Sequence, residues 1–463
     1  MGLLVNADAG RDFDVIVIGA GAAGISAAVE LAAAGLRCTI LEARDRIGGR
    51  IFTVIDPLHN HPVELGAEFI HGRPPEILDL LRAAKVSVHE TAGDHWCAEN
   101  GQLRICDFSS DLDKILRKLD DQEPDQSFLD FLKTYSGEDQ KPPRQRRAEQ
   151  WATSYVSGFN AADPALVGVH WLVEGMRADE KIEGHRTFRA KHGYADLIEI
   201  FRQQLKQARV PMRVSTVVHS ISWKPGRVEV TAGSPQGVLQ LSAARVVITV
   251  PLGVLQAAAD ERGSIQFNPE LPPTTQSAIR NILMGKVIRV TLRFRDRFWA
   301  GLPKNRGSGG KTLDEMGFLF SHDDWFPTWW STLPNKSPFL VGWAPFLCAE
   351  RLSGRGDPFI VDKSIETLSR LLSTRKDELQ ALLEHAYLHD WQTDPFARGA
   401  YSYGKAGHEH APRDLSTAIE GTLFFAGEAT DLNGHTGTVH GAMSSGRRAA
   451  AQIVKAAPNS SSR

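Results

Sequence analysis

Residues 13–24 read Phe13-Asp14-Val15-Ile16-Val17-Ile18-Gly19-Ala20-Gly21-Ala22-Ala23-Gly24, and this stretch decides the fold of the N-terminal region. The run from Phe13 to Ile18 is rich in Val and Ile, which predicts a parallel strand buried on both faces. The Ala-rich residues 22–34 predict a buried helix that ends at Gly35. Three glycines spaced G-x-G-x-x-G between a strand and a helix indicate a Rossmann-type dinucleotide site.

Each glycine of this loop has its own steric task. Gly19 permits the tight turn, Gly21 lets the backbone approach a pyrophosphate, and Gly24 allows close packing of helix on strand. The helix N-terminus faces the phosphate charge. A second strand over residues 38–41 ends at Glu42, whose carboxylate we expect to accept hydrogen bonds from ribose hydroxyls. An acid at this position disfavours a 2′-phosphate, so the loop suits NAD or FAD rather than NADP.

Composition places the chain among ordinary soluble globular proteins. It has 463 residues and a net charge of −2, so no overall field attracts nucleic acid or anionic lipid. The length predicts two domains. We find no membrane-length apolar run, no signal peptide, and no metal or redox motif among the four cysteines. We therefore expect a cytoplasmic protein in a reducing compartment, a monomer or homodimer, with a small-molecule partner.

Helices and a second sheet follow the first unit. Hydrophobic spacing predicts helices over 75–84, 112–132, 194–207, 360–388 and 441–456, and strands over 214–230, 245–250, 286–294 and 423–426. The strand at 286–294 alternates as a half-buried antiparallel strand does. Polar or glycine-rich composition predicts exposed loops over 137–147 and 295–311.

The segment Arg44-Asp45-Arg46-Ile47-Gly48-Gly49-Arg50 decides between NAD and FAD. Three arginines and paired glycines suit a second set of phosphate oxygens. The segment resembles the second FAD motif of the flavin-containing amine oxidase family. Further segments similar to that family are ELGAEFIHG (64–72), VITVPLGVL (247–255), FFAGE (424–428) and TVHGA (438–442). Together they span nearly the whole chain.

The resemblance implies a bound FAD. Arg46 and Arg50 would contact phosphates, Val218 would meet adenine, and Glu428 would lie by the ribityl and phosphate region. Ala400 stands where membrane-bound monoamine oxidases carry the cysteine that bonds the flavin, so we expect non-covalent FAD. The cofactor-binding residues that we expect are Gly19, Gly21, Ala23, Gly24, Glu42, Ala43, Arg44, Gly49, Arg50, Gly66, Ala67, Glu68, Val218, Trp391, Gly427, Glu428, Thr438 and Val439.

Amine oxidation by flavin needs little acid–base machinery, because the flavin takes the hydride and the protein orients the neutral amine. Lys286 resembles the family lysine that holds a water near flavin N5, and desolvation would lower its pKa. Trp391 and Tyr401 match the segment that lines the flavin ring, and the face of Tyr401 could hold the amine nitrogen. Thr438 replaces the second tyrosine of the aromatic cage. His71 is a substrate-site candidate.

This open half-cage is similar to polyamine oxidases and lysine-specific histone demethylases, although no histone-binding module is visible. The resemblance implies an α/β fold, in which a Rossmann-type FAD-binding domain is interleaved with an α+β substrate-binding domain. We assign residues 12–80, 205–284 and 388–457 to the FAD-binding domain, and residues 81–204 and 285–387 to the substrate-binding domain.

We therefore predict an FAD-dependent amine oxidase that oxidises a C–N bond of a polyamine or related amine by hydride transfer to flavin N5. Its products would be an imine or aldehyde and hydrogen peroxide, with molecular oxygen as acceptor. The alternatives are a primary monoamine oxidase, an L-amino acid oxidase with an arginine for the substrate carboxylate, a desaturase, and a non-catalytic FAD-binding scaffold.

Three glutamates and one histidine-containing segment are further candidates for ligand binding. Glu68, Glu174 and Glu180 could anchor a second positive amine, but surface carboxylates are commoner. The stretch 408–410, His-Glu-His, could bind a metal, but alternate positions in a polar segment favour a solvated loop, so we expect no metal.

Overall fold

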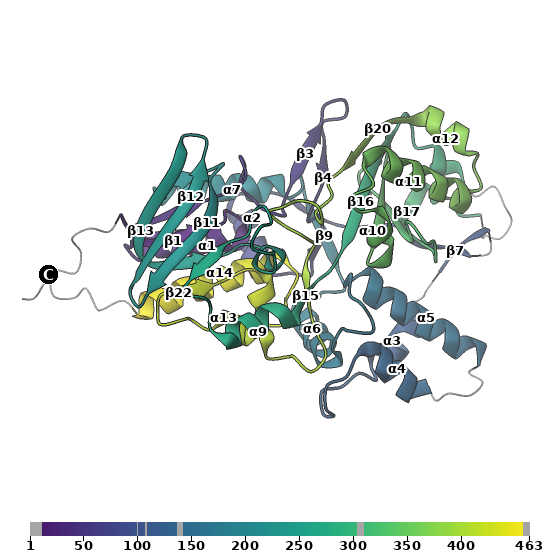
Figure 1. Cartoon of the computed structure of the whole chain (residues 1–463). Coiled ribbons are helices and arrows are strands. Elements are labelled where there is room, and N and C mark those ends of the chain that lie inside the picture. Colours follow the sequence, from purple (N-terminus) through teal and green to yellow (C-terminus); the bar gives the residue numbers. More distant parts are fainter. Residues whose placement is uncertain (1–11, 100, 107–108, 137–141, 303–309, 457–463) are drawn as a thin grey trace, which may run out of the picture.

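The computed structural model describes residues 12–99, 101–106, 109–136, 142–302 and 310–456. An eight-stranded sheet and a seven-stranded sheet form the two halves of the molecule, and helices cover both (Figure 1). This is the α/β fold expected from the sequence, with a Rossmann-type half joined to a second half.

The first sheet is built around the glycine-loop strand. β1 (Phe13–Ile18) pairs in parallel with β2 (Cys38–Leu41) and with β13 (Gly237–Ile248). β10 (Met212–Arg213) flanks β2, and β22 (Leu423–Phe425) flanks the carboxyl half of β13, both in parallel. Because these five strands run in one direction, their carboxyl ends meet at one edge, where ligands bind in open α/β sheets.

An antiparallel extension and several helices complete this half. β12 (Arg227–Ser234) and β11 (Val217–Lys224) extend from β13, followed by β14 (Gln266–Asn268). The helix after the glycine loop, α1 (Ala22–Ala33), packs along the C-terminal α14 (Val439–Ala456). The remaining helices here are α2 (Pro75–Ala83), α7 (Ala195–Gln207), α8 (Leu252–Leu255), α9 (Pro273–Asn281) and α13 (Ala411–Ser416).

The second sheet has the order β20-β16-β19-β18-β17-β7-β8 and a core rich in tryptophan and phenylalanine. Its strands are β7 (Asp94–Glu99), β8 (Gln102–Ile105), β16 (Val287–Phe294), β17 (Met316–Phe320), β18 (Thr328–Ser331), β19 (Phe339–Pro345) and β20 (Leu383–Leu388). The helices α10 (Leu347–Leu352), α11 (Asp357–Leu372) and α12 (Lys376–Leu382) accompany it.

A helical group lies beside this sheet (Figure 1). It consists of α3 (Ser109–Leu116), α4 (Phe128–Ser136), α5 (Pro143–Gly158) and α6 (Val169–Lys181). Three small sheets join the parts: β3 (Thr53–Asp56) with β4 (His61–Glu64), β15 (Ile282–Met284) with β21 (Ser402–Gly404), and β5 (Ile70–His71) with β9 (Thr187–Ala190) and β6 (Val88–Glu90).

The structure differs from the expected secondary structure at four places. The expected loop at 137–147 contains the start of α5 at Pro143, a residue suited to the first turn of a helix, while 137–141 lie outside the described residues. The expected helix 112–132 is two helices, α3 and α4. The expected helix 360–388 is the two helices α11 and α12 followed by β20. β16 is buried on both faces rather than one, because one face packs in the core of the second sheet and the other carries Arg289 and Arg293, which pair with buried carboxylates.

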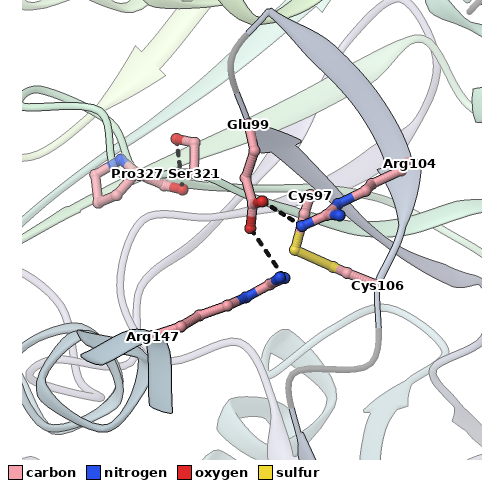
Figure 2. The surroundings of a disulfide bond; sticks show 7 residues. All are labelled: Cys97, Glu99, Arg104, Cys106, Arg147, Ser321 and Pro327. Carbon is pink, nitrogen blue, oxygen red and sulfur yellow. Dashed lines mark hydrogen bonds and ion pairs between the residues drawn. A yellow bond between two sulfur atoms is a disulfide. The ribbon is translucent and has the colours of Figure 1, made fainter. Parts of the chain in front are cut away.

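A disulfide joins Cys97 to Cys106 across the β7–β8 hairpin (Figure 2). Beside it, Glu99 forms ion pairs with Arg104 and Arg147. The cysteine spacing in the sequence did not suggest this pair. Structural disulfides are rare in reducing compartments, so this bond counts against the reducing cytoplasmic location expected from the sequence. No helix in the described part of the chain is long and apolar enough to cross a membrane.

Candidate active site

One large cavity, about 1620 Å³, lies between the Rossmann-type half and the second half. This exceeds the usual 300–1,000 Å³ of a small-molecule pocket, so it has room for a large cofactor and a substrate together. Nearly all the catalytic and cofactor-binding residues expected from the sequence line it; the exceptions are Gly24, Arg46 and Lys286. Segments far apart in the chain therefore form a single site.

The glycine loop has the shape that a pyrophosphate requires. Gly19 has φ +103°, and a Cβ on Gly24 would lie 2.0 Å from the Gly19 carbonyl oxygen, so both positions exclude a side chain. Beside Gly21, in contrast, a Cβ would meet nothing within 4 Å. No side chain caps the start of α1 in the described structure, so its N–H groups face this open space.

The acid after β2 organises the neighbouring backbone. Glu42 is buried; its Oε2 accepts from the Ala20 amide at 2.7 Å and its Oε1 accepts from the Arg44 amide at 2.8 Å. Arg44 forms an ion pair with Asp394 at 2.7 Å. Ala43 and Val218 line the same end of the cavity. This end matches the expected adenosine site.

The pair Arg50–Glu428 connects the N- and C-terminal segments. Arg50 Nη1 donates to Glu428 Oε1 at 2.8 Å and to the Ala400 carbonyl oxygen at 2.8 Å. Glu428 Oε2 accepts from the Ser402 hydroxyl at 2.6 Å and from the Gly437 amide at 3.0 Å. Glu428 is thus a buried junction residue as well as a cavity wall.

Arg46 does not lie where the family resemblance placed it. It is not among the residues that line the cavity; its guanidinium lies 3.9 Å from the centroid of the Phe52 ring and donates to the carbonyl oxygens of Ile47 and Ile51. Burial lowers the pKa of Arg46 to about 10. Arg46 therefore stabilises the backbone of the loop through hydrogen bonds outside the cavity. Arg44 and Arg50 are the arginines of this segment that line the cavity.

Lys286 is also not where the resemblance placed it. Its side chain is 48% exposed, its ammonium forms an ion pair with Glu350 at 2.8 Å, and it does not line the cavity. The expected desolvated amine is therefore wrong for this residue. Lys286 precedes β16, and three residues later Arg289 faces the cavity, because side chains alternate between the two faces of a strand.

Arg289 belongs to a buried charge cluster. Its Nη2 lies 2.6 Å from Glu68 Oε2, and Arg189 Nη2 lies 2.7 Å from Glu68 Oε1. The Trp330 indole N–H also donates to Glu68. Burial alone would raise the pKa of Glu68, but the two guanidinium groups lower it below its ordinary value. Arg289 donates as well to the carbonyl oxygen of Gly66, within the motif expected at the cofactor.

Aromatic side chains form the inner wall of the cavity. Tyr401 donates its hydroxyl to the Phe159 carbonyl oxygen at 2.7 Å, and the Phe159 ring stacks on Tyr155 at 5.2 Å with an interplanar angle of 7°. The edge of His71 meets Phe159 at 5.3 Å. Trp391 donates its indole N–H to the Leu65 carbonyl oxygen. Sequence reasoning found Tyr401, His71 and Trp391 but missed the aromatic residues that other elements contribute: Phe69, Tyr155, Phe159, Phe318, Trp330 and Trp343.

Two buried histidines line this inner region. Burial lowers the pKa of His71 to about 4. Burial together with His435 and His71 lowers the pKa of His440 to about 3. Both rings are therefore neutral at neutral pH and carry no charge that would repel an amine. Thr438 lines the cavity nearby, with its hydroxyl bonded to the His435 carbonyl oxygen.

Of the three candidate anchors, Glu68 belongs to the inner wall, but its carboxylate is already paired with two arginines. Glu174 does not line the cavity, and Glu180 lies at its exposed margin. Asp125, His170 and Glu409 come within 4.8 Å of one another, but both Asp125 oxygens already accept backbone amides. This group gives no reason to revise the expectation of no metal.

The chain is similar to known proteins along nearly its whole length. The family model described as flavin containing amine oxidoreductase matches residues 22–454. Polyamine oxidase 4 of Oryza sativa subsp. japonica is 28% identical, covering 95% of this chain and 88% of its own. The Arabidopsis thaliana protein named lysine-specific histone demethylase 1 homolog 2 is 27% identical, covering 97% of this chain and 59% of its own.

Solved structures share the fold. A structure of wild-type putrescine oxidase bound to putrescine superposes with a TM-score of 0.77 at 19% identity, covering 96% of this chain and 99% of that one. Cyclohexylamine oxidase from Brevibacterium oxydans superposes with a TM-score of 0.74 at 20% identity, with the same coverage.

Proposed function

Because this chain belongs to the family of flavin-containing amine oxidoreductases, we propose that it is an FAD-dependent oxidase whose substrates are polyamines or related amines. The reaction breaks a C–H bond next to nitrogen, yields an imine that water hydrolyses to a carbonyl compound, and reduces oxygen to hydrogen peroxide. The observation that carries the proposal is an aromatic inner wall with two neutral histidines, in the same cavity as the dinucleotide-binding segments.

The residues present fit FAD. The bare helix start at Gly21, the excluded side chains at Gly19 and Gly24, and the buried Glu42 suit a dinucleotide with an unmodified ribose. When bound, FAD supplies the hydride acceptor. Position 400 is alanine, whose methyl group cannot bond a flavin, so the cofactor is held without a covalent link.

Aromatic rings of the inner wall orient the amine, and the histidine beside them carries no charge. Tyr401 and Phe159 offer ring faces on which an amine can rest. His71 stays neutral above about pH 4, so it does not repel the amine. The enzyme therefore needs no strong base, because the amine that reacts is the neutral form.

We propose the two-domain division as 12–80, 205–284 and 388–457 for FAD and 81–204 and 285–387 for substrate. The two large sheets support it, since their strands fall on opposite sides of these boundaries almost throughout. α7 packs against α1 and α2, so the boundary between residues 204 and 205 fits better if it is moved to the start of this helix.

The L-amino acid oxidase alternative needs an arginine that is free to bind a carboxylate. Each arginine lining the cavity already has a carboxylate partner, and Arg289, the one in the inner wall, shares the carboxylate of Glu68 with Arg189. We therefore favour an amine without a carboxylate next to the reacting carbon.

Anaerobic mixing with an amine panel tests the proposal. We expect spermidine to bleach the flavin absorbance and, in air, to generate hydrogen peroxide, with benzylamine and leucine as comparison substrates. Turnover of leucine alone would refute the polyamine proposal, and a protein without flavin absorbance would favour the scaffold alternative.

The location of the protein is a separate proposal. The Cys97–Cys106 disulfide is typical of oxidising surroundings, so we propose that the chain functions outside the reducing cytosol. Mass spectrometry of unreduced protein from its natural host would test this: a free thiol at both cysteines contradicts it.

A further inference from the structure

Asp179 is a cavity carboxylate that is paired with none of the described residues. It lies in the last turn of α6, where the negative end of the helix dipole disfavours an anion. It lines the cavity and is half-buried, and burial raises its pKa. No described residue forms an ion pair or a hydrogen bond with its carboxylate oxygens. The nearby His435 ring acts in the opposite direction and lowers the pKa of Asp179, but no hydrogen bond or ion pair joins the two side chains.

The other carboxylates in the cavity wall differ from Asp179. Among the described residues, all but the exposed Glu180 are already paired with arginines or backbone amides; these are Glu42, Glu68, Glu90, Asp113, Asp323, Asp324 and Glu428. A half-buried anion without a partner is unfavourable, and it becomes favourable when a ligand brings a cation. Asp179 is thus the carboxylate best placed to bind a positive group of the substrate.

Aromatic residues extend the inner wall along the cavity that Asp179 also lines. The Tyr401 hydroxyl donates to the Phe159 carbonyl oxygen, and the Phe159 ring stacks on Tyr155. Tyr155 and Asp179 both line this cavity, and the charge of Asp179 contributes to the raised pKa of the Tyr155 phenol. Ring faces along this wall can support a methylene chain or a passing cation.

The position of Asp179 is fixed by close packing against the next loop. A Cβ on Gly184 would lie 2.5 Å from the Asp179 Cβ, so only glycine fits there. The base of the Asp179 side chain is therefore packed tightly against the loop after α6. A fixed anion selects for a cation at a set distance from the reacting carbon.

We propose that Asp179 binds a second, remote ammonium group of the substrate, so that the enzyme favours diamines and polyamines over monoamines of equal length. This inference rests on the proposed amine oxidation at the same site. The reacting nitrogen lies neutral at Tyr401 and Phe159, while the remote nitrogen remains protonated at Asp179. Sequence analysis considered Glu68, Glu174 and Glu180 for this role and did not consider Asp179.

Anaerobic reduction of the FAD-loaded enzyme tests the proposal in two steps. Wild-type protein is mixed with butylamine, 1,4-diaminobutane and spermidine, and the limiting rate and the apparent Kd are measured for each. We expect the diamine and spermidine to bind more tightly than butylamine. If no amine bleaches the flavin, the proposed function fails; if butylamine binds as tightly as the diamine, the anchor fails while the function stands.

Asp179→Asn then tests the residue, with Glu180→Gln as the matched control one residue along the same helix. We expect D179N to weaken diamine and spermidine binding about 10- to 100-fold, to leave the limiting rate unchanged, and to leave butylamine binding unchanged. FAD absorbance and thermal unfolding confirm that the variant is folded. Equal losses for butylamine and the diamine, or an equal loss in E180Q, would overturn the proposal.

Discussion

Replacement of Glu68 by Gln tests whether the buried charge cluster stabilises the fold. Glu68 and Arg289 have side chains that are 9% and 8% exposed, and Arg189 completes the cluster. E68Q leaves two buried guanidinium groups without their counter-charge. Removing one partner of a buried pair costs about 3–5 kcal/mol. We expect a loss of that size in the free energy of unfolding at pH 7.

The pH dependence of this loss has a definite sign. The pKa of Glu68 in the folded protein is below its ordinary value of 4.5. The stabilisation is therefore complete above about pH 4.5 and declines as the pH falls through the folded pKa. The difference between wild type and E68Q should be largest at neutral pH and should shrink on acidification.

Urea unfolding followed by tryptophan fluorescence, at one fixed FAD concentration, measures the effect. Glu90→Gln is the control, because Glu90 forms its ion pair with Arg186 at the exposed surface, and we expect no measurable change. The double variant E68Q with Arg289→Met should lose less than the sum of the single losses, since the two residues interact directly. Equal unfolding midpoints for E68Q and E90Q, or additive single losses, would refute the reasoning.

Three other variants follow from the structure. Gly24→Ala places a Cβ 2.0 Å from the Gly19 carbonyl oxygen, so we expect purified protein that has lost its flavin absorbance; full FAD content would contradict the packing argument. Replacing both Cys97 and Cys106 by Ser removes a disulfide with a sequence separation of 9, which should lower the free energy of unfolding by about 2–3 kcal/mol. An unchanged midpoint of urea unfolding would show that the disulfide does not stabilise the fold. The pKa of His71 is about 4 in the folded protein, against an ordinary value of 6.5, so the unfolded chain binds a proton first and the free energy of unfolding falls as the pH decreases from 6.5 to 4. His71→Asn should make this fall shallower when the unfolding temperature is measured against pH. An unchanged dependence on pH would contradict the burial of a neutral ring.

The elements that sequence analysis placed well are those set by local pattern. β1, α1 and β2 follow from a buried apolar run, an Ala-rich helix and an acid at a fixed distance, all within about thirty residues. Errors arose where local pattern was ambiguous. The stretch 383–388 continues a helical spacing but forms β20, because pairing with β16 decides its conformation.

The cavity residues likewise divide into those that sequence motifs placed correctly and those that only the folded structure placed. Family-like motifs placed Arg50, Glu428 and Trp391 on the cavity, but they also placed Arg46 and Lys286 there, and both point elsewhere. Along a strand, a shift by an odd number of residues moves a side chain to the other face, so a motif alone cannot choose between residues 286 and 289.

The sequence by itself determined a dinucleotide-binding Rossmann unit. The glycines of the G-x-G-x-x-G loop at residues 19–24 have no side chains, and this alone permits the tight turn and the close backbone approach that the loop needs. The tertiary structure alone decided which charges meet: Glu68 pairs with Arg189 and Arg289, whereas Asp179 has no partner among the described residues. The physical reason is that an ion pair depends on the distance between side chains from different elements, and sequence separation does not fix that distance.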